Sequence, residues 1–109
     1  MVIYEVNLTV QLGIWSEYTR WLAQHIEQIL LLKGFEWADV FEVLEPPAEG
    51  ARQICVQYHL KNEKALQSYF KHQADEMRQD AIERFGDQFS ATRRILMPLP
   101  EGGLLHLAE

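Results

Sequence analysis

Residues 2–10 read VIYEVNLTV, and this stretch decides the fold. Every second residue in it is apolar, whereas the residues in between include Glu5 and Asn7. A period of two with β-branched and aromatic residues is typical of a strand that buries one face. Residues 52–60, which read RQICVQYHL, alternate in the same way. We therefore expect two strands, each with one apolar face and one half-polar face.

Between and after these strands the apolar residues recur at helical spacing. Residues 14–33 carry an apolar stripe at intervals of four, four, four and three, and Gly34 gives a stop signal directly after Lys33. A single second helix is expected over residues 62–85, with Asn62 as its N-cap. Two further strands are expected at residues 35–45 and 89–97. The second strand alternates poorly, so its faces cannot be assigned from the sequence.

The order strand, helix, strand, strand, helix, strand is the split βαβ pattern. We predict an α+β, ferredoxin-like βαββαβ domain over residues 1–98 with a four-stranded antiparallel sheet, followed by a tail over residues 99–109. Right-handed crossovers place residues 2–10 and 52–60 in the centre of the sheet, where we expect them to run parallel, with both helices on one face. The opposite face, called the open face below, carries Ile3, Glu5, Asn7, Thr9, Cys55, Gln57 and His59.

Composition excludes several classes of function. The chain has 109 residues, a net charge of −6 and no basic run longer than Arg93-Arg94, so neither a nucleic-acid nor a membrane partner is expected. Cys55 is the only cysteine, and no histidine spacing typical of a metal site occurs, so we expect neither a metal nor a cofactor. The N-terminus lacks a basic segment, which predicts a cytoplasmic protein.

The candidate ligand-binding residues lie on the open face or beside it: Glu5, Asn7, Trp37, Gln57, His59 and Arg94. A buried charge needs a partner, so Arg94 or its neighbour Arg93 is expected to approach Glu5. One interpretation is a polar cluster that grips a small ligand, with Trp37 or Phe41 as an aromatic wall. The other is a hydrogen-bonded dimer interface in which these residues satisfy one another. The sequence favours neither.

The histidines, the cysteine and Arg78 are further residues with side chains suited to catalysis or binding. His59 is the candidate catalytic base, whereas His25 and His72, on the flanks of helical stripes, are expected to be hydrogen-bonded structural residues. Cys55 has no adjacent cation and is expected to be a buried, unreactive thiol. Arg78 is expected to be solvated or paired within its helix.

Three stretches resemble an uncharacterised bacterial family, a domain of unknown function within the dimeric α+β barrel superfamily. They are residues 1–10 (MVIYEVNLTV), residues 18–35 (with YTRWLAQHI and the Gly34-Phe35 pair) and residues 72–94 (with MRQD, RFG and the Arg93-Arg94 pair). The resemblance implies a homodimer in which the open face packs on a second copy. Haem-degrading relatives have an asparagine on the first strand, which Asn7 matches. They also have a tryptophan and a histidine on the second helix. In this sequence Tyr69 lies near the position of that tryptophan, and His72 comes too early on the helix to match that histidine.

Three functions follow as alternatives. The first is a homodimer that binds a small molecule in a pocket between the sheet and the partner copy. The second is a cofactor-free monooxygenase or isomerase. The third is a structural dimer without a ligand.

Overall fold

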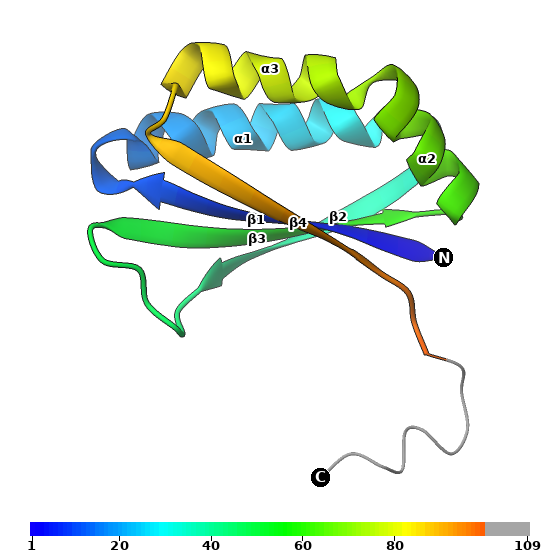
Figure 1. Ribbon diagram of the computed structural model, residues 1–109, viewed down its shortest axis with the longest axis horizontal. Coiled ribbons are helices and arrows are strands. Elements are labelled where there is room, and N and C mark those ends of the chain that lie inside the picture. The colour runs from blue at the N-terminus through cyan, green and yellow to red at the C-terminus, as the bar shows by residue number, and fades with distance from the viewer. Residues whose placement is uncertain (100–109) are drawn as a thin grey trace, which may run out of the picture.

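The computed structural model describes residues 1–99 as one sheet covered on one side by helices (Figure 1). The elements in chain order are β1 (Val2–Gln11), a short 3-10 turn (Leu12–Ile14), α1 (Trp15–Leu30), β2 (Phe35–Val43), β3 (Ala51–Leu60), α2 (Glu63–His72), α3 (Ala74–Phe85) and β4 (Phe89–Leu96). The expected ferredoxin-like α+β fold is confirmed. The expected tail, residues 99–109, lies outside the described residues except for its first residue. No helix within residues 1–99 has the length and apolar character to cross a membrane.

The sheet has the strand order β2-β3-β1-β4, and every neighbouring pair is antiparallel. The central position of β1 and β3 is confirmed, but the expectation that these two strands run parallel is wrong. Each crossover joins two parallel strands with a third strand between them. The intervening strand therefore runs antiparallel to both, and β3 fills that place between β1 and β2.

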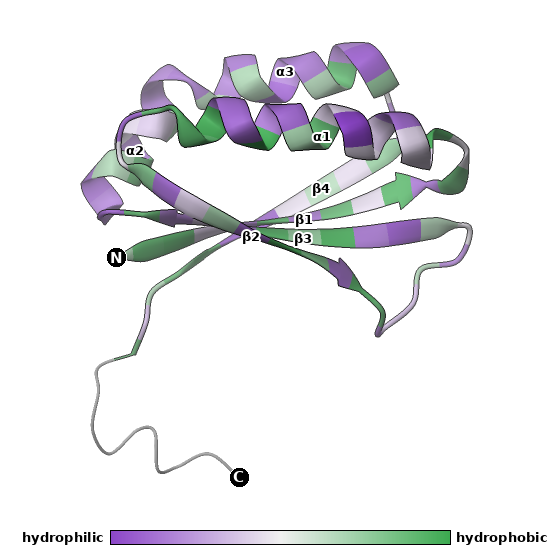
Figure 2. Ribbon diagram, turned by 180° about the vertical axis from the view of Figure 1, so that it is seen from behind, coloured by the Kyte–Doolittle hydropathy of each residue, from purple (hydrophilic) through white to green (hydrophobic). Residues whose placement is uncertain are grey.

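The apolar faces of the two central strands lie under the helices, as expected. Val2, Tyr4, Leu8 and Val10 of β1 and Ile54, Val56, Tyr58 and Leu60 of β3 are all buried in the core. Helix α1 adds Tyr18, Leu22 and Ile29 from its apolar stripe. Figure 2 shows that α1 alternates between hydrophilic and hydrophobic residues, as a helix with one face on a sheet must.

The second helix is broken, which the sequence did not predict. Asn62 caps α2 by accepting a hydrogen bond from the Ala65 amide at 2.9 Å, but the helix ends at His72, and Gln73 has φ −135°. Neither proline nor glycine marks the break. Figure 1 shows α2 descending steeply at the edge of the helical layer, whereas α3 lies beside α1. The break lets both Tyr69 and Ala81 face the core.

Gly34 sits where the turn after α1 meets the start of α2. Its φ is +91°, a conformation that side-chain-bearing residues rarely adopt, and a Cβ there would lie 2.4 Å from the Ala65 Cβ. The helix end predicted at this glycine is therefore confirmed. Tertiary packing against Ala65 is a second reason for glycine at this position.

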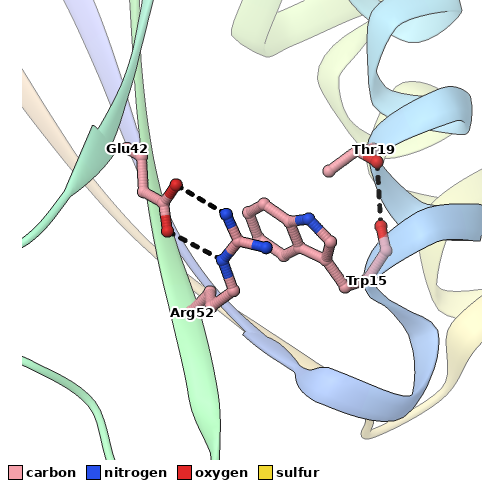
Figure 3. A network of polar contacts seen from close by, with 4 residues as sticks. All are labelled: Trp15, Thr19, Glu42 and Arg52. Carbon is pink, nitrogen blue, oxygen red and sulfur yellow. Dashed lines mark hydrogen bonds and ion pairs between the residues drawn. The ribbon is translucent and has the colours of Figure 1, made fainter.

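The far end of the sheet is tied to α1 by Arg52 (Figure 3). Its guanidinium donates to both carboxylate oxygens of Glu42, at 2.8 and 2.7 Å, and lies 3.9 Å from the centre of the Trp15 ring. The bidentate ion pair and the stacking of the guanidinium on an aromatic ring together fix the direction of the arginine side chain. This contact joins β2, β3 and the first turn of α1.

Candidate functional site

Strand register brings the predicted residues together on the open face. Gln57 lies opposite Glu5 on one side, and Arg94 lies opposite Glu5 on the other. Trp37 lies opposite His59. Because partners across an antiparallel pair point to the same face, all of these side chains share the face that no helix covers.

Glu5 is the centre of a hydrogen-bond network on this face. Its carboxylate accepts from Arg94 Nε at 2.6 Å, from Asn7 Nδ2 at 2.8 Å and from Gln57 Nε2 at 3.0 Å. Glu5 is only 2% exposed even in the single chain. The expected approach of an arginine to Glu5 is confirmed, and the alternation of β4 selects Arg94.

The same contacts control the ionisation of Glu5. The hydrogen bond from Arg94 lowers the pKa most, those from Asn7 and Gln57 lower it further, and burial opposes them, so that the pKa falls from 4.5 to about 2. Glu5 is therefore a fixed negative charge with three donors already in place. A carboxylate so fully occupied has little capacity left to bind a ligand.

His59 is held by two neighbours on the same face. Its Nε2 lies 3.0 Å from Asp39 Oδ2, and its ring stacks on Trp37 with centroids 4.3 Å apart. Within residues 1–99 its Nδ1 is buried without a hydrogen-bond partner. A carboxylate orients the imidazole, as in many general bases, but the nitrogen without a partner is closed off from solvent.

The remainder of the open face is apolar or unreactive. Trp37 is 42% exposed and Phe41 is 50% exposed. Cys55 is buried, and burial together with the nearby Glu5 carboxylate raises its pKa to about 11. The expectation of a buried thiol is therefore confirmed.

A cavity of about 300 Å³ lies on the other side of the sheet, between the strands and the helices. We call it the helix-side cavity. Apolar residues make much of its wall, and four tyrosines together with His25, Arg78 and Arg93 supply polar groups; the tyrosines are Tyr4, Tyr18, Tyr58 and Tyr69. A largely apolar hollow with a few convergent polar groups is the usual form of a small-molecule site.

Arg78 reaches this cavity from α3. Its Nη2 donates to the Tyr4 hydroxyl at 3.1 Å, and its side chain is half-buried. The expectation that Arg78 is solvated or paired within its helix is wrong. The spacing held the relevant signal, because Arg78 lies four residues after Ala74 and three before Ala81, both buried, and therefore shares their face.

His25 lines the cavity from α1 and stacks on Trp21, with ring centroids 4.5 Å apart. Trp21 in turn donates from Nε1 to Asp80 Oδ2 at 2.8 Å. Burial lowers the pKa of His25 below 6.5, an effect that the charge of Asp80 only partly offsets. The imidazole is therefore neutral at neutral pH and able to accept a proton. Apart from the position of His25 on a helix flank, no pattern in the sequence indicates this cavity.

Comparisons with known proteins agree with this fold. The model of a family described as a domain of unknown function (DUF4286) matches residues 1–99. Among proteins of curated function, none matches the chain.

Several solved structures are similar. A Deinococcus radiodurans protein described as an antibiotic biosynthesis monooxygenase has a TM-score of 0.70 at 15% identity, over 94% of this chain and 97% of its own. The haem degrader MhuD from Mycobacterium tuberculosis, with two haems bound in its active site, has a TM-score of 0.64 at 16% identity, over 94% and 100%. The cofactor-independent oxygenase SnoaB from Streptomyces nogalater, as a mutant, has a TM-score of 0.63 at 9% identity, over 92% and 95%. At these identities the likeness shows the fold.

Proposed function

This chain belongs to the family described as a domain of unknown function (DUF4286), and we propose that it is a homodimeric small-molecule-binding protein whose ligand occupies the helix-side cavity. The observation that carries the proposal is the cavity itself, about 300 Å³ between the helices and the sheet. Its apolar wall suits the body of a ligand, and its arginines, histidine and tyrosines suit a polar group on that ligand. Haem bound in the active site of MhuD supports ligand binding within this fold.

The open face supports the dimer rather than a second ligand site. Glu5, Arg94 and Gln57 already satisfy one another, whereas Trp37 and Phe41 expose large rings beside them. Exposed aromatic residues around a satisfied polar centre are typical of a surface that packs on a partner. A pocket enclosed between this face and a second copy, as the sequence suggested, stays a prediction.

Binding can be tested with phenylnaphthylamine, a neutral apolar dye that fluoresces when it leaves water. We expect a saturable rise in fluorescence with the native protein. The variant Ala81→Phe places a ring in the cavity wall, where Ala81 is buried, and should abolish the rise. The matched control Gln79→Phe puts the same ring on the exposed side of α3 and should bind like the native chain.

Ala81→Phe must remain folded for this result to count. Overpacking a core position costs about 1–3 kcal/mol, so its melting temperature is measured alongside, and Ala81→Leu serves as a milder second variant. No fluorescence rise with the native protein, or an equal rise in all variants, would contradict ligand binding in the cavity. The structural dimer without a ligand would then be the better account.

A cofactor-free oxygenase or isomerase is the second candidate, and neutral His25 in the cavity wall is the observation that favours it. Such a base removes a proton from an activated CH₂ group. The carbanion then takes up O₂, leaving a ketone and water. Dithranol, a tricyclic phenol with one such CH₂, is a suitable test substrate.

We expect oxygen uptake above the rate without protein, lost in His25→Gln and retained in His59→Gln. Loss in the second variant alone would instead support His59, which Asp39 orients on the open face. Uptake no faster than without protein would remove the support for this second candidate.

A further inference from the structure

We propose that the helix-side cavity is built for a small organic anion with an apolar body, and that Arg78 and Arg93 recognise its negative group. The inference rests on the proposed function, because it specifies the ligand of the same cavity. Two observations support it: the positive charge of the cavity wall, and the absence of a carboxylate paired with either arginine among the described residues.

The cavity wall has the opposite charge from the chain as a whole. The chain has 16 acidic and 10 basic residues, a net charge of −6. Within residues 1–99, no aspartate or glutamate lines the cavity, although two arginines and a histidine do. An acid-free, doubly cationic wall in an acidic protein attracts and holds an anion.

The two cavity arginines differ from others in the chain in what they contact. Arg52, Arg84 and Arg94 each pair with a carboxylate, of Glu42, Asp80 and Glu5 respectively. In the part of the chain that the structure describes, Arg78 and Arg93 have no such pair, and neither does Arg20, which is exposed and lies outside the cavity. Arg93 is exposed and hydrated, so the half-buried Arg78 is the cavity cation whose charge has no balancing group among the described residues.

Arg78 carries the stronger part of this argument. Its guanidinium meets the neutral hydroxyl of Tyr4, and among residues 1–99 its Nε is buried without a partner. A half-buried cation lacking a counter-charge is destabilising, and an anionic ligand would relieve that. The planar guanidinium also matches a carboxylate or sulfonate better than an ammonium group would.

Arg93 approaches the same space from the sheet. It lies opposite Val6 in the β1–β4 ladder, on the helix side, one position from Arg94 on the open face. Arg93 lines the cavity together with Tyr18 and Tyr69, and the rest of its side chain is exposed. The adjacent arginines of β4 thus serve opposite faces: Arg94 neutralises Glu5, and Arg93 stays free for the cavity.

A pair of dyes that share one skeleton tests the proposal. Anilinonaphthalene sulfonate is phenylnaphthylamine with an added sulfonate, so the two differ in a single negative group. Dissociation constants of both are measured with the native protein and with Arg78→Gln, Arg93→Gln and the control Arg20→Gln. Arg20, an exposed residue of α1, controls for the loss of one positive charge.

We expect the native protein to bind the sulfonate at least about tenfold more tightly than the neutral dye, because charge-assisted hydrogen bonds to a shielded arginine are strong. Arg78→Gln should remove most of this preference and Arg93→Gln part of it, while binding of the neutral dye stays within about twofold. Arg20→Gln should change neither dye.

Equal affinity for both dyes, or a sulfonate affinity that Arg78→Gln leaves intact, would overturn the anion proposal while leaving the cavity as a neutral ligand site. Binding of neither dye would overturn it together with the proposed function. A sulfonate affinity that survives Ala81→Phe would place the dye outside the cavity and count against the proposal.

Discussion

Glu5 and Arg78 are charged residues on opposite faces of the sheet, and they differ in whether their charge is balanced by a partner. Glu5 is nearly fully buried and receives three hydrogen bonds, one of them from Arg94 at 2.6 Å. Arg78 is half-buried; among the described residues it donates to a neutral hydroxyl and lies 5.9 Å from the centre of the Phe70 ring, with no carboxylate paired to it. A satisfied buried charge stabilises a structure or an interface, whereas an unsatisfied one marks a place for a ligand.

The low pKa of Glu5 predicts a pH dependence of stability. Since the carboxyl has a pKa of about 2 when folded against 4.5 ordinarily, it stabilises the fold at pH values above about 4.5. This contribution is lost as the pH falls toward 2. In urea unfolding, the native chain should lose about 3 kcal/mol more stability than Glu5→Gln between pH 5 and pH 2. The control Glu27→Gln, at an exposed site on α1, should lose as much as the native chain. Parallel pH profiles for native and Glu5→Gln would contradict the network.

A contact between Glu5 and one arginine of the Arg93-Arg94 pair could be predicted from the sequence, because adjacent strands with period-two alternation leave few partners for a buried acid; the choice of Arg94 came from the structure. The contact between Asp39 and His59 could not. The register of β2 shifts between Phe35 and Trp37, so the two rings face opposite sides of the sheet although they are two residues apart. A bulge of this kind erases the alternation by which faces are assigned.

At the scale of elements, long periodic segments were predictable and their breaks were not. The stripe that predicted one helix over residues 62–85 continues through Gln73, where the helix changes direction without proline or glycine. Helix α2 contacts β1 and β3, whereas α3 lies beside α1 (Figure 1). The break also places Arg78 of α3 within hydrogen-bond distance of Tyr4. The contact of Arg78 was wrongly predicted because the direction of α3 could not be predicted from the sequence.

Gly34 gives a prediction at the same scale. Gly50 and Gly34 both have positive φ, +71° and +91°, but only Gly34 has a neighbour that an added Cβ would meet. Gly50→Ala should therefore reduce the free energy of unfolding by about 1 kcal/mol, through backbone strain alone. Gly34→Ala should reduce it by about 3 kcal/mol, because displacement of Ala65 adds to the strain. Equal losses in chemical denaturation would show that the turn and α2 are not packed as described.

At the scale of the whole molecule, one sheet separates two different environments. The helix side carries the core and the cavity, whereas the open face carries a satisfied polar centre with exposed aromatic rings. The sequence predicted which residues of β1 and β3 share the open face, but not which residues of β2 and β4 join them. It could not predict the cavity, because a hollow depends on how far α1 and α3 stand from the sheet, and this distance has no signature in periodicity.

The homodimer leads to a prediction about mass in solution. Sedimentation analysis should give the native chain twice its single-chain mass at micromolar concentration. Phe41→Asp, which puts a charge on the open face, should shift the protein toward the single-chain mass without unfolding it. The control Leu31→Asp, at an 86% exposed position after α1, should remain dimeric. A native chain that sediments at its single-chain mass would contradict the dimer.

Backbone amide chemical shifts, recorded while phenylnaphthylamine is added, test the central claim most directly. The two faces of the sheet are distinguishable residue by residue, because neighbouring positions on a strand point to opposite sides. If the ligand occupies the helix-side cavity, the largest shifts will fall on α3 around Met77 and Ala81 and on α1 around His25. Shifts confined to β2 around Trp37 and Phe41, with α1 and α3 unchanged, would contradict the account and place the site on the open face.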